Sequence, residues 1–238
     1  MKPQTGSLAL IASAAYVDTE IAAEYGKLPP SFLPFGHGRL FESQVATLRQ
    51  SAERVALTIP ASFAIDDVDA TWFAAQNVDV IRVPDGLSLS KSIAFAIQSC
   101  GETTALTLLH GDTLILGTPK CTLDCVAVAT PPRGYQWGHL SLADAKVEGI
   151  DASLSSTPSE AVAGWFSFSR PEVLLECLEI SPTDFIGALE LYTKKVGLLA
   201  ARVEEWLDFG HLHTFHHSRA KVNTARSFNS VNMDRRTV

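Results

Sequence analysis

The first half of the chain alternates short apolar runs with stretches in which apolar residues recur at helical spacing. Continuous apolar runs separated by amphipathic helices predict an α/β fold, with a mainly parallel central sheet and helices on both faces. Right-handed crossovers in such a sheet place the ligand crevice at the carboxyl ends of the strands. The expected strands are residues 8–12, 54–59, 78–83 and 105–109, and the expected helices are residues 41–51, 68–75 and 89–97.

The second half is patterned differently, because its strand-like runs lie closer together. This spacing predicts a mixed second half that packs on the same sheet rather than a separate domain. We therefore expect one domain over residues 1–225 and a tail over 226–238, which could lead into a further domain. The expected strands are 125–129, 138–142 and 161–169, the stretch 196–209 is expected to be extended, and the expected helices are 171–178, 183–195 and 211–221.

Charge and apolar content narrow the class of protein. The formal net charge of −7 argues against a nucleic-acid partner, which normally needs a basic surface. No apolar run approaches the roughly 18 residues that cross a bilayer, so we expect no membrane span. The four cysteines are scattered without a CxxC pair, which is typical of ordinary thiols in a reducing compartment and predicts a cytoplasmic protein.

The N-terminal apolar stretch, residues 8–15, has two interpretations. It contains small residues and follows Lys2, as a secretory signal would, although only one basic residue precedes it. It also has the length of a buried first strand. We favour the strand, because the alternation that follows needs one.

The first candidate for chemistry is the segment 108–113, in which an apolar strand ends in Gly111 and Asp112. A carboxylate at the carboxyl end of a central strand lies where open α/β sheets bind their ligands. It can hold Mg²⁺, which prefers oxygen ligands and often binds together with phosphates. The alternative is that Asp112 serves only as a turn residue.

The segment 206–211 repeats this arrangement, because an extended stretch ends in Asp208 and Gly210 precedes an expected helix. Asp208 could also cap that helix, and the two roles are compatible. Carboxylates on neighbouring strand ends can share one cation, so Asp112 and Asp208 are the predicted Mg²⁺ ligands. The alternative is a zinc site, without an HExxH pattern, among His211, His213, His216 and His217.

The order of these segments resembles the nucleotidyltransferases that activate sugar phosphates with nucleoside triphosphates. Residues 33–36 and 40–42 resemble the loop and helix after that family's signature lysine, and residues 110–112 and 206–210 resemble its two metal-binding acids. The ending WxDFGH…SR…FN, residues 206–229, resembles a capsular or surface-polysaccharide subgroup. Residues 87–97 resemble the segment of that family that helps hold the base. Residues 163–168 resemble its aromatic strand, which lines the sugar pocket, and residues 183–185 resemble the segment that follows this strand.

The resemblance implies a nucleotidyltransferase fold of the Rossmann-like, GT-A type. It also implies an enzyme that couples an NTP to a sugar phosphate or similar phosphorylated small molecule, releases pyrophosphate and uses Mg²⁺. It is compatible with a homodimer. The catalytic residues would be Asp112, Asp208 and Arg39. The substrate-binding residues would be Gly86, Ser88, Gly111, Gly164, Trp165, Asp184 and His211. For Trp165 the alternative is a place in the core.

The chain departs from this family at the phosphate loop. The stretch 12–18 contains no glycine, although glycine permits the close backbone approach that a phosphate cradle needs. No lysine stands at the signature position near residues 30–31; Lys27 is the nearest candidate, and Arg39, Lys91 or Arg219 could supply the missing positive charge.

Two other functions therefore stay open. One is a degenerate domain that binds a nucleotide or sugar phosphate without turnover. The other is a glycosyltransferase that uses a nucleotide sugar, which would usually show an Asp-x-Asp pair; here His110 stands where the first acid would be.

Overall fold

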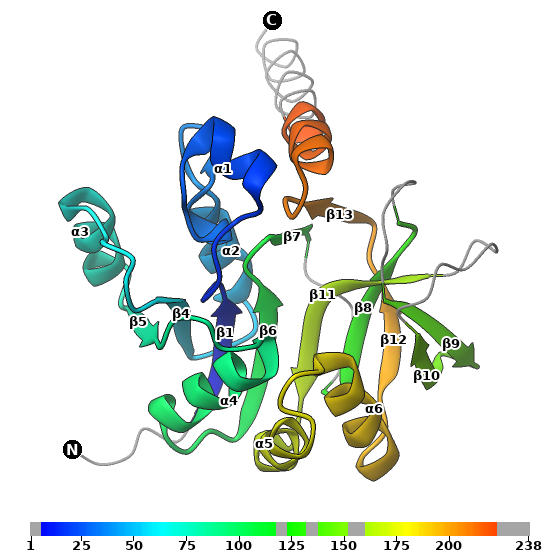
Figure 1. The fold of residues 1–238 in the computed structure, drawn as a ribbon. Helices are drawn as coiled ribbons and strands as arrows, with labels where there is room; N and C mark the ends of the chain where they lie inside the picture. The colour runs from blue at the N-terminus through cyan, green and yellow to red at the C-terminus, as the bar shows by residue number, and fades with distance from the viewer. Residues whose placement is uncertain (1–5, 118–122, 132–137, 152–159, 223–238) are drawn as a thin grey trace, which may run out of the picture.

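A nine-stranded sheet runs through both halves of the chain, in the order β5-β4-β1-β6-β11-β8-β12-β10-β9 (Figure 1). The computed structural model describes residues 6–117, 123–131, 138–151 and 160–222. Four neighbouring strands are parallel, so their carboxyl ends meet at one edge of the sheet. These strands are β1 (Ser7–Ala12), β4 (Arg54–Pro60), β5 (Val78–Val83) and β6 (Ala105–His110).

Beyond β6 the sheet becomes mixed, as the closer spacing of the second half predicts. β11 (Ala161–Phe168) runs antiparallel to both β6 and β8 (Cys125–Ala129). β12 (Leu199–Arg202) then pairs with β8 in parallel. The antiparallel hairpin of β9 (His139–Ala143) and β10 (Lys146–Asp151) completes the sheet.

Helices cover both faces of the sheet, and β1 supplies side chains to both, as the two-residue repeat of a strand requires. Leu8 and Leu10 belong to one apolar cluster, whereas Ala9 and Ile11 belong to the other. The expected α/β fold, with helices on both faces and a mixed second half, is therefore confirmed. The first cluster is covered by α4 (Leu89–Cys100), α5 (Pro171–Ile180) and α6 (Phe185–Lys195), and the second by α2 (Leu40–Leu48) and α3 (Asp67–Ala75).

A third apolar cluster joins elements that lie beyond the carboxyl ends of the parallel strands, and Figure 1 shows the place of these elements. The sequence did not predict several of its parts, because they are too short to show a clear period. The extended stretch 196–209 divides into β12 and a second strand, β13, which leaves the main sheet. The cluster joins α1 (Thr19–Tyr25), the hairpin β2–β3 (Pro34–Phe35 and Gly38–Arg39), the pair β7 (Thr113–Leu116) and β13 (Glu205–Asp208), and a final helix at 212–222.

The cysteines differ from the expectation of four ordinary thiols. Cys100 and Cys177 are free, but Cys125 is disulfide-bonded. Among the helices that the structure describes, none combines the length and the apolar character of a membrane span.

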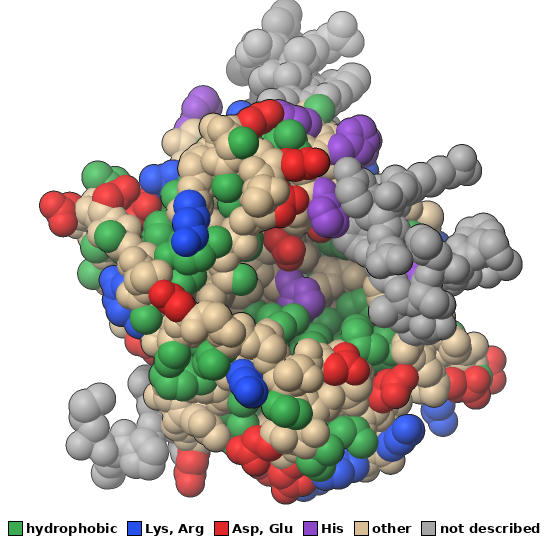
Figure 2. All heavy atoms as spheres, viewed as in Figure 1, with side chains coloured by type: hydrophobic (Ala, Val, Ile, Leu, Met, Phe, Trp, Pro, Cys, Tyr) green, Lys and Arg blue, Asp and Glu red, His purple; other side chains and the backbone are tan. Residues whose placement is uncertain are grey.

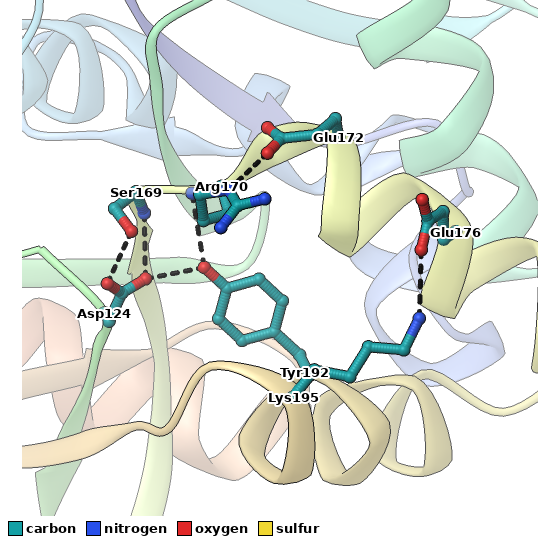
Figure 3. A network of polar contacts seen from close by, with 7 residues as sticks. All are labelled: Asp124, Ser169, Arg170, Glu172, Glu176, Tyr192 and Lys195. Atoms are coloured by element: carbon teal, nitrogen blue, oxygen red, sulfur yellow. Dashed lines mark hydrogen bonds and ion pairs between the residues drawn. The ribbon is translucent and has the colours of Figure 1, made fainter.

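A polar network ties β8, β11 and α6 together at the end of the sheet opposite the carboxyl ends of β1 and β6 (Figure 3). The Asp124 carboxylate accepts hydrogen bonds from Ser169 N at 2.9 Å, from Ser169 Oγ at 2.6 Å and from the Tyr192 hydroxyl at 2.6 Å. Tyr192 is fully buried, and burial, followed by the hydrogen bond and charge of Asp124, raises its pKa well above the ordinary value. The Tyr192 hydroxyl therefore keeps its proton, and its role as a hydrogen-bond donor, at any physiological pH.

The substitution Tyr192→Phe tests this network. It removes the hydroxyl and leaves the half-buried Asp124 carboxylate and the Arg170 N–H with one partner fewer. We expect the free energy of unfolding to fall by about 1–2 kcal/mol in urea denaturation. Tyr16→Phe is the matched control, because its hydroxyl bonds to Ser62 at an exposed site and its loss should cost little. Equal effects of the two substitutions would contradict a special role for the network.

Candidate active site

Asp112 and Asp208 lie side by side because β7 and β13 pair in one register. Thr113 is paired with Asp208, and Phe209 N donates to the Asp112 carbonyl at 2.8 Å. Gly210 lies against both side chains. A Cβ added to Gly210 would lie 3.0 Å from Asp112 Oδ2 and 3.5 Å from Asp208 Oδ1. The backbone pairing thus brings together the two carboxylates that the sequence singled out.

The turn that carries Asp112 is held by an amide from α2. Gln44 is fully buried, and its Nε2 donates to the carbonyls of Gly111 at 3.0 Å and Thr113 at 2.8 Å. The Ser31 hydroxyl donates to the same Gly111 carbonyl at 3.1 Å. These bonds satisfy carbonyls on both sides of Asp112, so they fix the position of its backbone.

Neutral hydrogen bonds extend this support across the neighbouring strands. Ser31 N donates to Ser13 Oγ at 3.1 Å, and Ser13 N donates to Thr58 Oγ1 at 2.8 Å. A side chain on Gly111 would meet the Ser13 Cβ at 2.6 Å, so only glycine allows β6 to end this close to the end of β1. Gly111 therefore has a packing role, and its carbonyl belongs to the support of Asp112.

The final helix holds Asp208. The Thr214 hydroxyl donates to Asp208 Oδ2, and Gly210 N donates to the same oxygen at 3.3 Å. The Ser218 hydroxyl donates to the Asp208 carbonyl at 2.8 Å. The helix begins at residue 212, and the Asp208 carboxylate accepts from a side chain of that helix and from Gly210 N before it, so Asp208 does not have the N-cap role that the sequence allowed. Its Oδ1 lies on the Gly210 side, near Asp112.

Burial and mutual repulsion dominate the electrostatics of the pair. Burial first, and the nearby Asp112 charge second, raise the pKa of Asp208 from its ordinary value to about 7. Burial also lowers the pKa of His110, against the opposing effect of Asp112, so this imidazole is neutral at pH 7. A bound divalent cation would relieve the repulsion between the two acids, and oxygen ligands suit Mg²⁺. The donor set therefore fits the ion that the sequence implied.

Asp112 and Asp208 help to line a cavity of about 170 Å³. Figure 2 shows a hollow on this face with histidine, acidic and apolar side chains on its walls. The walls include Asp112 and Asp208, the rings of His110, Phe166 and Phe185, and Gly164. Gly164 has φ +72° at the register shift of β11, where a Cβ would lie 2.6 Å from Thr113 Oγ1. Only glycine fits there, because its φ is positive and a side chain would clash.

A second cavity, of about 350 Å³, opens at the same edge of the sheet, after β1, β4 and β5. Its walls include Tyr16, Lys27, Ser62, Asp85 and Gly86. Lys27 Nζ lies 4.3 Å from the centre of the Tyr16 ring, a cation–π contact. Lys27 is the one lysine or arginine among the described residues that line these two cavities.

Several predicted substrate-binding residues lie elsewhere. Trp165 is a core residue, because its side chain packs in the cluster under α2 and α3; Phe166 faces the cavity instead. The Ser88 hydroxyl caps α4, accepting from Lys91 N at 3.3 Å, and also donates to the Pro182 carbonyl. Asp184 precedes α6 and is exposed, whereas the next residue, Phe185, lines the cavity.

The predicted charged groups also have partners of their own. The Arg39 guanidinium lies 3.4 Å from the carboxylates of both Asp66 and Asp69, so the structure does not bring it to the acid pair. Arg219 donates to the Tyr25 hydroxyl at 3.2 Å. His211 Nδ1 lies 3.8 Å from Asp18 Oδ2, at the start of α1. Within the described ranges no group of three potential metal-ligating side chains occurs, so the histidines of the final helix form no such zinc cluster there.

Sequence reasoning missed the residues that support the site from the core. Gln44 and Ser31 gave no signal, because a single polar residue in an apolar pattern has no distinctive spacing. Phe166 could have been found only by locating the register shift in β11, which changes the face that each side chain of that strand takes. Phe185 begins α6, and its place in the cavity depends on how that helix packs on the sheet.

Comparisons with known proteins identify the fold. No protein-family model matches the chain, and no curated protein matches its sequence. Among solved structures, UTP-bound UGPase from Acinetobacter baumannii has a TM-score of 0.71 at 14% identity, covering 97% of this chain and 99% of that one.

Two further structures agree with it. CTP:phosphocholine cytidylyltransferase from Streptococcus pneumoniae has a TM-score of 0.71 at 10% identity, covering 92% of this chain and 99% of its own. Inositol-1-phosphate CTP transferase from T. maritima has a TM-score of 0.65 at 12% identity, covering 92% and 96%. The chain thus has the fold of the nucleotidyltransferases.

The substitution Asp208→Asn should stabilise the metal-free protein at neutral pH. An aspartate in the unfolded chain loses its proton near pH 4, whereas the folded pKa of Asp208 is about 7. The wild type therefore loses stability relative to the variant as the pH rises from about 4 to about 7, and the difference is constant above that range. We expect a gain of roughly 2–4 kcal/mol at pH 8 and little at pH 4.

Urea unfolding across this pH range, without divalent ions, measures the effect. Asp67→Asn is the matched control, because Asp67 is an exposed acid in the first turn of α3. A difference between the Asp208→Asn variant and the wild type that does not change with pH would contradict the raised pKa.

Proposed function

We propose that the chain is a Mg²⁺-dependent nucleotidyltransferase that couples an NTP to a sugar phosphate or similar phosphorylated small molecule and releases pyrophosphate. The observation that carries this proposal is the carboxylate pair, Asp112 and Asp208, held at the strand ends beside a cavity in a nucleotidyltransferase fold. The second cavity at the same edge offers room for a nucleotide. The names of similar structures, which include a UDP-glucose pyrophosphorylase and a CTP:phosphocholine cytidylyltransferase, supply the substrate class.

Asp112 and Asp208 would hold the Mg²⁺ ion, which orients phosphates and neutralises charge when it is bound. In the reaction an oxygen of the acceptor phosphate attacks the α-phosphorus of the NTP. The bond from the α-phosphorus to the bridging oxygen breaks, and pyrophosphate leaves, so no protein nucleophile is needed. Lys27, on the wall of the second cavity, would meet the NTP phosphates, and the wall around Gly164 would receive the acceptor.

The proposal extends to the domain organisation, the biological role and the location of the protein. One nine-stranded sheet takes strands from both halves, which supports a single domain over residues 1–225. The ending from Trp206 to Asn229 supports a role in surface-polysaccharide synthesis, and a need for NTPs would place the reaction in the cytoplasm. The order of segments remains compatible with a homodimer.

A second candidate is binding without transfer. It is favoured by the shortage of positive charge, since Lys27 is the one lysine or arginine among the described lining residues. Nucleotidyl transfer needs positive charge on the α-phosphate and on the departing pyrophosphate. Under this candidate the same pockets hold a nucleotide and a sugar phosphate, and no pyrophosphate forms.

A pyrophosphate-release assay separates the two candidates. The protein is mixed with Mg²⁺, each of the four NTPs, and glucose 1-phosphate, inositol 1-phosphate or phosphocholine. We expect release with one pairing, and at least about a 100-fold loss of kcat/KM in Asp112→Asn, because a metal ligand is removed. Asp67→Asn should be fully active, and melting curves should show both variants folded. Binding of NTP with no pyrophosphate from any pairing would establish the second candidate, and an active Asp112→Asn would remove the pair from the mechanism.

A further inference from the structure

His110 stands in the cavity beside the carboxylate pair, and the reaction described above gives it no role. Its ring is fixed by two neighbours: the centre lies 5.4 Å from that of Phe166 and 5.6 Å from that of Phe185. These two rings also contact each other, at 5.4 Å and nearly perpendicular. The imidazole therefore has little freedom to turn, and a ligand that binds to it loses little to side-chain ordering.

The two ring nitrogens of His110 lie in different surroundings. In the part of the chain that the structure describes, neither has a hydrogen-bond partner. Nε2 is buried, whereas Nδ1 is not, so Nδ1 is the nitrogen that can meet a molecule entering the cavity. A buried N–H without an acceptor is rarer in proteins than an unpaired acceptor. The hydrogen is therefore best placed on Nδ1, which makes it a donor.

The rest of the wall is suited to a compact carbon skeleton. Phe166, Phe185, Val162 and Ile186 present apolar surface, and the volume of about 170 Å³ suits one small ring. The carboxylates with their cation would take the phosphate end of an acceptor. A donor on His110 at the apolar end would then meet an oxygen of the ring itself.

We propose that His110 determines acceptor specificity: Nδ1–H donates a hydrogen bond to a hydroxyl oxygen of the acceptor's ring, whose carbon face lies against Phe166 and Phe185. This inference rests on the proposed function in one respect, namely that this cavity holds the acceptor. The hydrogen bond selects sugar or cyclitol phosphates over phosphate esters that lack a hydroxyl group, because such esters leave the Nδ1 donor unpaired.

Equilibrium binding in Mg²⁺, measured by calorimetry without NTP, tests this inference independently of turnover. The probes are glucose 1-phosphate, phosphocholine and inorganic phosphate. The wild type should bind glucose 1-phosphate more tightly than phosphocholine. His110→Phe keeps an aromatic ring against Phe166 and Phe185 but removes the hydrogen-bond donor. It should weaken the affinity for glucose 1-phosphate about 10- to 100-fold and leave the affinities for phosphocholine and inorganic phosphate unchanged.

His110→Gln is the second variant, because it retains an N–H donor and should recover part of the lost affinity. Three results would each overturn the proposal. They are equal binding of glucose 1-phosphate and phosphocholine by the wild type, equal weakening of all three probes in His110→Phe, and unchanged glucose 1-phosphate affinity in that variant. Equal weakening would show that His110 meets the phosphate instead. Failure to release pyrophosphate would count against the proposed enzyme activity but not against this result.

Discussion

Backbone hydrogen bonds between β7 and β13 hold two acids together against their mutual repulsion. The pairing of Thr113 with Asp208 leaves both carboxylates beside Gly210, where no side chain separates them. Their closeness costs free energy in the absence of a cation, and after burial the charge of Asp112 is the second cause that raises the pKa of Asp208. The rest of the fold supplies the stability that makes such a site tolerable, as the Asp124–Tyr192 network does at the other end of the sheet.

The edge of the sheet beside Asp112 is built from neutral groups. Ser13, Ser31, Thr58 and Gln44 are all buried there, and they bond to one another or to the backbone around Asp112. The resemblance to nucleotidyltransferases would have placed a glycine-rich loop and a lysine at this edge. Here Ser31 turns inward and donates to Gly111, so the position supports the acid instead of meeting a phosphate.

The sequence was sufficient to predict the parallel half of the sheet, because β1, β4 and β6 are buried apolar runs and helical stretches separate these strands and β5 from one another. It also singled out Asp112 and Asp208, since each ends an extended segment beside a glycine. It could not predict which neighbours contact those acids. The positions of Arg39 and Trp165 depend on an ion pair with α3 and on a register shift, and both are tertiary effects.

The pairing of β7 with β13 also sets the order in which the site can appear during synthesis. Asp112 belongs to the parallel half, whose strands can associate as soon as they leave the ribosome, whereas β13 emerges only after α6 and β12. Until then β7 is an unpaired edge, and Asp112 remains hydrated with no second acid nearby. The pair of acids is therefore absent from a nascent chain, and the proposed Mg²⁺ site would be completed only with one of the last contacts in the described chain.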